Sequence, residues 1–232
     1  MGTLKELKER VWHCNMDLFT KNLVVQTFGN VSAIDRDKGI MAIKPSGVPY
    51  SELSPNKIVL VDLNNKVINS NLKPSSDTPT HTVLYNAFSE IGGIVHTHSP
   101  YATAWAQAKK PIPCLGTTHA DFIQGEIPCT DELSDNQIKG NYEIETGNQI
   151  IKRFKDISPS EVEMVLVANH GPFTWGKTAE DAVNNTVILE ELAKISLFTI
   201  LLDPNVKKIK KSILDKHFFR KHGKNAYYGQ RK

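Results

Sequence analysis

Three histidines are the residues of this 232-residue chain most able to do chemistry. His96 and His98 lie in the run Gly-Gly-Ile-Val-His-Thr-His-Ser-Pro, whose β-branched residues predict a strand. Side chains two positions apart on a strand share a face, so both imidazoles should face one point. His170 follows Leu-Val-Ala-Asn and should end a second strand, which Gly171-Pro172 would stop. Three converging imidazoles with a fourth position open are typical of a catalytic divalent-metal site.

A His-x-His pair alone is weak evidence, because most histidines are satisfied polar groups of the surface or core. Here both histidine segments are flanked by apolar residues, where an imidazole needs specific partners. Asp77, in Lys-Pro-Ser-Ser-Asp-Thr-Pro-Thr-His, adds a carboxylate on a turn that leads into a predicted helix. These two features favour the metal site over a structural role.

Three short polar segments have the composition of anion-binding turns. They precede a strand, follow a strand and precede a helix, and they contain Gly29, Asn30, Lys44, Ser46, Gly47, Ser75 and Ser76. Free backbone amides, small hydroxyls and a lysine suit a phosphate group. The alternative is the ordinary turn chemistry of Gly, Asn and Ser, and the residues alone leave both interpretations open.

The elements that position these residues alternate along the chain. We expect helices over residues 3–22, 80–90, 101–109, 144–154 and 178–202, the first and last opening on Thr-x-x-Glu and Thr-x-x-Asp capping sequences. Hairpins should pair 31–35 with 40–44 and 58–62 with 67–69, strands should cover 94–98 and 164–170, and residues 111–136 should form loops and short strands. This order predicts a layered α/β domain with much antiparallel pairing.

Composition limits the function classes. Nothing marks a domain boundary, and the net charge of +3 disfavours bulk nucleic-acid binding while suiting a small anionic substrate. The three cysteines lack Cys-x-x-Cys spacing, so they indicate neither a disulfide framework nor a thiolate zinc site. The chain shows no signal-type apolar core and no apolar run near the ~18 residues of a membrane span. We expect a soluble, cytoplasmic protein.

Six separated motifs agree with one known family in sequence order. They are Gly-Asn-Val-Ser (29–32), Lys-Pro-Ser-Gly (44–47), Ser-Ser-Asp-Thr-Pro-Thr-His (75–81), His-Thr-His-Ser (96–99), Ala-Asn-His-Gly (168–171) and Ala-Tyr-Tyr-Gly-Gln (226–230). Together they resemble the L-ribulose-5-phosphate 4-epimerases of the class II aldolase/adducin-like family. The resemblance implies a homotetramer of three-layer α/β/α subunits with a mostly antiparallel sheet. Residues 1–232 would form a single domain, and metal sites would lie at subunit interfaces.

The resemblance also implies roles for individual residues. Zn²⁺, or another divalent ion such as Mn²⁺, would be held by His96, His98 and His170, with Asp77 at the metal. The seven residues of the polar segments would line the substrate and its phosphate. Asp121 and Tyr228 would be the acid/base pair, with His217 and Arg220 as further substrate-pocket residues. The tail 216–232, which is unusually aromatic and basic for a terminus, would complete a neighbouring subunit's active site.

The implied activity is that of an isomerase. It would interconvert L-ribulose 5-phosphate and D-xylulose 5-phosphate by retro-aldol cleavage and re-formation of the carbon 3–carbon 4 bond, because the hydrogen on carbon 4 is too far from the ketone to be acidic. Aldolases of this group carry a glutamate where Asp77 stands, so the shorter carboxylate favours the epimerase.

Three alternatives remain on the sequence alone. A class II sugar-phosphate aldolase would release both fragments, and a non-catalytic module like the adducin head would have lost the metal ligands. An unrelated zinc hydrolase lacks support from a His-Glu-x-x-His motif. The resemblance implies a place in carbohydrate metabolism of pentose phosphates, such as arabinose catabolism, and the residues leave the pathway open.

Overall fold

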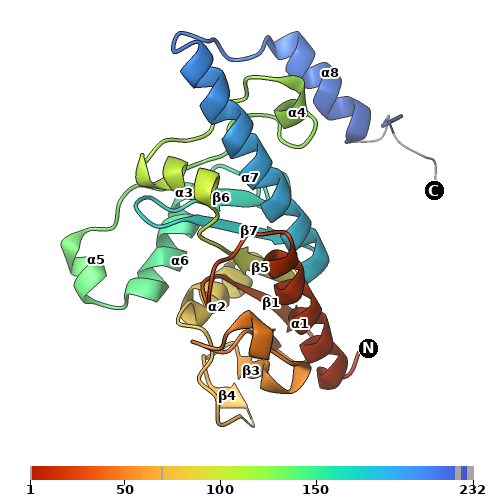
Figure 1. Cartoon of the computed structure of the whole chain (residues 1–232), viewed down its shortest axis with the longest axis vertical. Helices are drawn as coiled ribbons and strands as arrows, with labels where there is room; N and C mark the ends of the chain where they lie inside the picture. Colours follow the sequence, from red (N-terminus) through yellow and green to blue (C-terminus); the bar gives the residue numbers. More distant parts are fainter. Residues whose placement is uncertain (1, 69, 223–225, 229–232) are drawn as a thin grey trace.

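A seven-stranded antiparallel sheet forms the centre of the computed structural model, which describes residues 2–68, 70–222 and 226–228 (Figure 1). Within these residues the strand order is β4-β3-β2-β1-β5-β7-β6. The strands are β1 (Asn30–Asp35), β2 (Ile40–Ile43), β3 (Val59–Asp62), β4 (Val67–Ile68), β5 (Gly93–His96), β6 (Met164–Leu166) and β7 (Pro172–Gly176). The α-helices are α1 (Leu4–Thr20), α2 (Thr78–Ala87), α3 (Pro100–Gln107), α4 (Thr117–Ala120), α5 (Asp135–Lys139), α6 (Tyr142–Arg153), α7 (Ala179–Leu202) and α8 (Lys211–Lys221). Two 3₁₀ helices, η1 (Tyr50–Glu52) and η2 (Pro55–Lys57), precede β3.

Helices cover both faces of the sheet, because successive strand residues point to opposite sides. Val31 and Ala33 of β1 pack with apolar residues of α1 and α7 in one buried cluster. Met41 of β2 and Ile94 of β5 pack on the other face with residues of α2 and α6. The predicted three-layer α/β/α architecture with an antiparallel sheet is therefore confirmed.

The local sequence patterns with the clearest chemistry produce the predicted elements. Both hairpins are present, as β1–β2 and β3–β4. Thr3 and Glu6 form the expected capping box of α1, and Thr178 and Asp181 form that of α7. In each box the threonine hydroxyl accepts from the third helical N–H, which would otherwise lack a partner. None of the helices in the described part of the chain has the length and apolarity needed to cross a membrane.

Several element boundaries differ from the prediction. Helix α2 begins at Thr78 and ends at Ala87, earlier at both ends than expected. The segment 111–136, expected to contain loops and short strands, also contains the short helix α4. Asn69, predicted to end the second hairpin, lies outside the described residues.

The prediction that Gly171-Pro172 stops a strand ending at His170 was wrong. Strand β6 ends at Leu166, and a tight turn follows in which Asn169 has a φ of 62°. Pro172 then begins β7, where the first strand position tolerates a residue without an N–H. The buried β7 pairs with both β5 and β6, so His170 lies on the turn between two strands.

The segment that follows β5 is fixed by a contact from α7. The sequence predicted that His98 lies within this strand. Strand β5 instead ends at His96, so His98 lies beyond it. Pro100 occupies the first turn of α3 as expected, but Ser99 makes no side-chain cap. Instead, the Glu190 carboxylate of α7 accepts from the backbone N–H groups of Tyr101 and Ala102, each at 2.9 Å. This carboxylate satisfies two free donors of α3 and anchors the chain directly after His98.

Candidate active site

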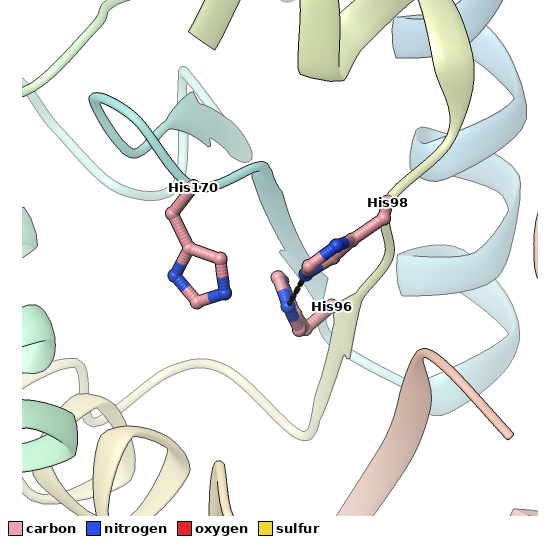
Figure 2. Close-up of side chains that lie close together, drawn as sticks. All are labelled: His96, His98 and His170. Atoms are coloured by element: carbon pink, nitrogen blue, oxygen red, sulfur yellow. Dashed lines mark hydrogen bonds between the residues drawn. The ribbon is translucent and has the colours of Figure 1, made fainter. Parts of the chain in front are cut away.

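The three predicted histidines converge although they come from different segments. His96 ends β5, His98 follows it, and His170 reaches the same point from the β6–β7 turn. One nitrogen of each ring lies within 4.8 Å of the other two (Figure 2). This is the one such cluster of three or more His, Cys, Asp or Glu side chains found in the described residues.

The hydrogen bonds around the rings orient them toward a shared ion. The Nδ1–H of His96 donates to the carbonyl oxygen of Pro172 at 2.9 Å, because a carbonyl can only accept. In a neutral ring its Nε2 is then unprotonated, and it lies 3.1 Å from Nε2 of His98 (Figure 2). Nδ1 of His170 lies 3.4 Å from the Tyr142 hydroxyl, which leaves its Nε2 side facing the other rings. Orientation through the distal nitrogen is typical of metal-ligating histidines, so these residues fit a divalent cation.

Burial also keeps these rings in the form that binds a cation. It lowers the pKa of His170 to about 3, with a further contribution from the nearby His96. The His98 side chain is exposed, but surrounding atoms desolvate its ring in part, and this lowers its pKa as well, again with a contribution from His96. The two imidazoles are therefore neutral near pH 7, with lone pairs available to a metal.

A cavity of about 390 Å³ opens beside the histidines and is large enough for a small-molecule substrate. Its lining combines the three histidines with all three predicted anion-binding segments, namely Gly29, Asn30, Lys44, Ser46, Gly47, Ser75 and Ser76, and with Asp77. The structure thus brings together residues that are up to 141 positions apart, from Gly29 to His170. The cavity has imidazoles at one part of its wall and small polar residues at another.

Backbone and side-chain hydrogen bonds hold the polar segments together. The Ser75 N–H donates to the Lys44 carbonyl at 2.9 Å, and the Ser46 N–H donates to the Lys73 carbonyl at 3.0 Å. The Asn30 amide nitrogen donates to the Ser75 hydroxyl at 3.0 Å. Oδ1 of Asn30 is buried and has no hydrogen-bond partner among the described residues, so it remains an acceptor for a ligand hydroxyl.

Asp77 lies beside the histidines and is bound to the first strand. Its Oδ2 accepts from the Asn30 amide at 2.7 Å. Burial acts to raise the pKa of Asp77, but the neighbouring His96 and the Asn30 hydrogen bond are among the contacts that outweigh it, so the pKa is lowered. Asp77 is thus a carboxylate near neutral pH, and it belongs to the pocket wall without being part of the tight histidine cluster.

Lys44 is the positive charge of the pocket. It is only 2% exposed, and desolvation lowers the pKa of its ammonium group to about 8. Its Nζ donates to the Thr27 carbonyl at 3.1 Å. An anion in the pocket would stabilise the charged form of this lysine.

Five other lining residues were not identified as site residues from the sequence: Thr27, Phe28, Pro45, Tyr142 and Glu143. Phe28 stacks on the His98 ring with the centroids 6.0 Å apart. Tyr142 and Glu143 begin α6, whose start had been expected at Ile144, so they were placed in a loop. Extending the helical periodicity of α6 by one turn toward the N-terminus would have placed both residues in the helix.

The four remaining predicted residues form a second cluster, outside this pocket, within the described part of the chain. Asp121 accepts two hydrogen bonds from Arg220, at 3.0 and 2.7 Å, and one from His217 Nδ1 at 2.9 Å. Burial acts to raise the pKa of Asp121, but these bonds and one from Lys221 outweigh it and hold the pKa at about 2. Tyr228 joins the cluster, with the Arg220 guanidinium carbon 4.6 Å from its ring centroid.

This Asp121 cluster lies on α4, α8 and the tail. Helices α4 and α8 sit together at one end of the molecule, away from β3 and β4 (Figure 1). Tyr228 is 59% exposed, which leaves its phenol open to another chain. Residues 223–225 and 229–232 of the predicted tail, including the last two residues of the Ala-Tyr-Tyr-Gly-Gln motif, lie outside the described residues.

Comparisons with known proteins agree with this site. Residues 9–197 match the family model described as Class II Aldolase and Adducin N-terminal domain. Among solved structures, an L-fuculose 1-phosphate aldolase superposes with a TM-score of 0.76 at 24% identity, covering 91% of this chain and 94% of that one. YgbL from Klebsiella pneumoniae, described as a putative aldolase/epimerase/decarboxylase, gives a TM-score of 0.73 at 25% identity, covering 93% of this chain and 99% of that one.

Curated relatives are more similar in sequence. The L-ribulose-5-phosphate 4-epimerase UlaF of Salmonella paratyphi C (strain RKS4594) is 49% identical over 228 residues, covering 98% of this chain and all of the relative. UlaF of Salmonella choleraesuis (strain SC-B67) shows the same identity and coverage. The chain therefore belongs to the class II aldolase and adducin family and, within it, groups with the L-ribulose-5-phosphate 4-epimerases.

Proposed function

We propose that this protein is an L-ribulose-5-phosphate 4-epimerase, which interconverts L-ribulose 5-phosphate and D-xylulose 5-phosphate by breaking and remaking the carbon 3–carbon 4 bond. The observation that carries the proposal is a single pocket that joins the three-histidine cluster to the polar segments around Lys44 and Ser75. The 49% identity to curated epimerases over nearly the whole chain supports the same conclusion.

Zinc is the proposed ion, because three imidazole nitrogens with an open position suit tetrahedral Zn²⁺; the same donors would also bind Mn²⁺. A bound divalent ion supplies a Lewis acid that stabilises the negative charge left on the three-carbon fragment when the bond breaks, by several kcal/mol. Asp77 is proposed to lie at the ion on the Asn30 side. Asn30 holds its short side chain, and we propose that Asp77 therefore does not reach the fragment to exchange a proton with it, as the longer glutamate of aldolases would.

The polar segments are proposed to hold the phosphate. Lys44 supplies positive charge, and the hydroxyls of Ser46, Ser75 and Ser76 supply donors around it. Gly47 has a φ of 68°, a conformation that glycine adopts without strain, and a Cβ added there would have no atom of the described residues within 4 Å. Holding the phosphate would tether the two-carbon fragment, glycolaldehyde phosphate, while its aldehyde turns its other face to the bond-forming carbon.

Asp121 and Tyr228 are proposed as the acid/base pair that moves the proton on the carbon 4 oxygen, one for each epimer. The hydrogen bonds from Arg220 and His217 keep Asp121 ionised, which is the protonation state that accepts a proton, but the low pKa also makes it a weak base in this arrangement. Since this cluster lies outside the pocket of its own chain, we propose that it acts on the pocket of a neighbouring chain.

A homotetramer with metal sites at subunit interfaces is the proposed assembly. The C-terminal half of α7 carries solvent-exposed apolar side chains. Ile195, Phe198, Leu201 and Leu202 are 42%, 47%, 66% and 88% exposed. Burying them against another copy would remove this apolar surface from water. A sugar-phosphate substrate and metabolic-enzyme relatives favour a cytoplasmic location and a place in pentose metabolism, such as arabinose catabolism.

Product analysis tests the proposed activity against its alternatives. Purified, metal-supplemented protein incubated with L-ribulose 5-phosphate should yield D-xylulose 5-phosphate, identified by ¹³C NMR, without accumulation of fragments. Accumulating glycolaldehyde phosphate and dihydroxyacetone would indicate an aldolase. Unchanged substrate would indicate a non-catalytic module, an outcome that the three intact histidines disfavour.

A further inference from the structure

Tyr50 lies behind the pocket and contacts two of its walls. It is 2% exposed on η1 and is not itself a lining residue. Its hydroxyl proton is shared between the carbonyl oxygens of Phe28 and Gly29, each 3.1 Å away. The same ring lies 4.9 Å from Nζ of Lys44, measured to its centroid.

The first contact concerns the charge of Lys44. An ammonium group has three N–H donors, and the buried Lys44 uses one for the Thr27 carbonyl at 3.1 Å. The face of the Tyr50 ring supplies a second, electrostatic partner that needs no hydrogen-bond acceptor. A third donor is then left for an anion in the cavity that Lys44 lines. Without the ring, a poorly solvated cation would lose one of its few stabilising neighbours.

The second contact concerns the loop before β1. Gly29 has a φ of 77°, and a Cβ at this position would lie 2.6 Å from a Val24 methyl carbon, so the loop is tightly packed. The loop carries the Thr27 carbonyl that binds Lys44 and the Phe28 ring that stacks on His98. By binding the carbonyls of Phe28 and Gly29, the Tyr50 hydroxyl fixes both of these contacts.

We propose that Tyr50 is a positioning residue that sets the affinity of the pocket for the phosphate group of the substrate, by holding the Lys44 ammonium group with its ring and the 27–29 loop with its hydroxyl. The inference rests on the proposed function in that it names the residue that prepares the phosphate part of that site. The two contacts are separable, because Tyr50→Phe keeps the ring and loses only the hydroxyl, whereas Tyr50→Leu loses both.

Calorimetric titration of inorganic phosphate into the metal-loaded protein tests this directly. Tyr50→Leu should weaken phosphate binding by about tenfold or more, whereas Tyr50→Phe, which retains the cation–π contact, should weaken it by about threefold. In the epimerase assay the same changes should appear in KM, with kcat within about twofold of the unsubstituted enzyme.

Trp12→Phe is the matched control. Trp12 also anchors the η1 segment, by donating from Nε1 to the Leu53 carbonyl at 3.0 Å, but among the described residues no hydrogen bond, ring stacking or cation–π contact joins it to Lys44 or to the 27–29 loop. It should therefore leave phosphate binding unchanged. Circular dichroism and thermal unfolding would verify folding of each variant, and Tyr50→Phe alone carries the test if Tyr50→Leu does not fold.

The proposal is overturned if folded Tyr50→Leu or, in its absence, Tyr50→Phe binds phosphate as the unsubstituted protein does. It is equally overturned if Trp12→Phe weakens binding as much, or if kcat falls while KM is unchanged. Failure of the proposed function is distinguishable, because a protein without epimerase activity would still give the phosphate titrations by which Tyr50 is judged.

Discussion

Replacing His98 by alanine should remove the bound metal and the epimerase activity together. Two remaining imidazoles, His96 and His170, hold a divalent ion poorly, and the charge stabilisation that the ion supplies is lost with it. We expect kcat/KM to fall at least about a thousandfold, equivalent to about 4 kcal/mol of transition-state stabilisation. Elemental analysis of the purified variant and a coupled assay for D-xylulose 5-phosphate measure the two losses.

His98 is a better choice for this test than His96. The His96 side chain is buried and donates to the Pro172 carbonyl, so its removal would leave an unsatisfied acceptor in the core. His98 is exposed, and its removal should leave the fold intact. His13→Ala, an exposed histidine on α1, is the matched control and should retain both metal and activity. A His98→Ala variant with full activity and no metal would refute a metal-dependent reaction.

Replacing Tyr228 by phenylalanine should lower kcat by about 10²–10⁴-fold, the usual contribution of an acid/base group, while leaving the metal content unchanged. The phenol lies in the Asp121 cluster and not in the histidine pocket of its own chain. If the tail acts on a neighbouring chain, a site needs the histidines of one chain and the tyrosine of another.

Mixed oligomers test that arrangement. When His98→Ala and Tyr228→Phe chains are co-expressed and assemble at random in a closed ring, about a quarter of the sites combine intact histidines with an intact tail. Activity should therefore return to about a quarter of that of the unsubstituted enzyme, although each variant alone has about a hundredth of it or less. Two differently tagged His98→Ala chains, co-purified as a control, should stay inactive. Mixed oligomers of the two variants without recovered activity would place the tail in the site of its own chain.

The sequence was informative where one short segment determines both the structure and the chemistry. His96 and His98 follow a β-branched run, and the capping pair Thr178 and Asp181 marks the start of α7, so local rules were sufficient. The polar segments around Asn30, Lys44 and Ser75 could be recognised singly. Their meeting in one cavity depends on the pairing of β1, β2 and β5, which no local pattern specifies.

Most of the features that the sequence did not predict depend on long-range contacts. From its neighbours in sequence, Pro172 is expected to end a strand. It instead begins the interior strand β7, because a residue without an N–H is tolerated at the first strand position. The Glu190 carboxylate caps α3 from a helix 88 residues further along the chain, and Tyr50 contacts the 27–29 loop from a separate 3₁₀ helix. The Asp121 cluster likewise joins residues about a hundred positions apart, which only the folded chain brings together.

X-ray absorption spectroscopy of the protein, purified from cells supplied with zinc and manganese, tests the central claim most directly. We predict one divalent ion per chain, with a shell of nitrogen neighbours that includes three imidazoles at about 2.0–2.1 Å for Zn²⁺. This shell should lose one imidazole, or the ion altogether, in His98→Ala. Protein that is active on L-ribulose 5-phosphate but holds no divalent ion, or an ion surrounded by sulfur at about 2.3 Å, would contradict the account.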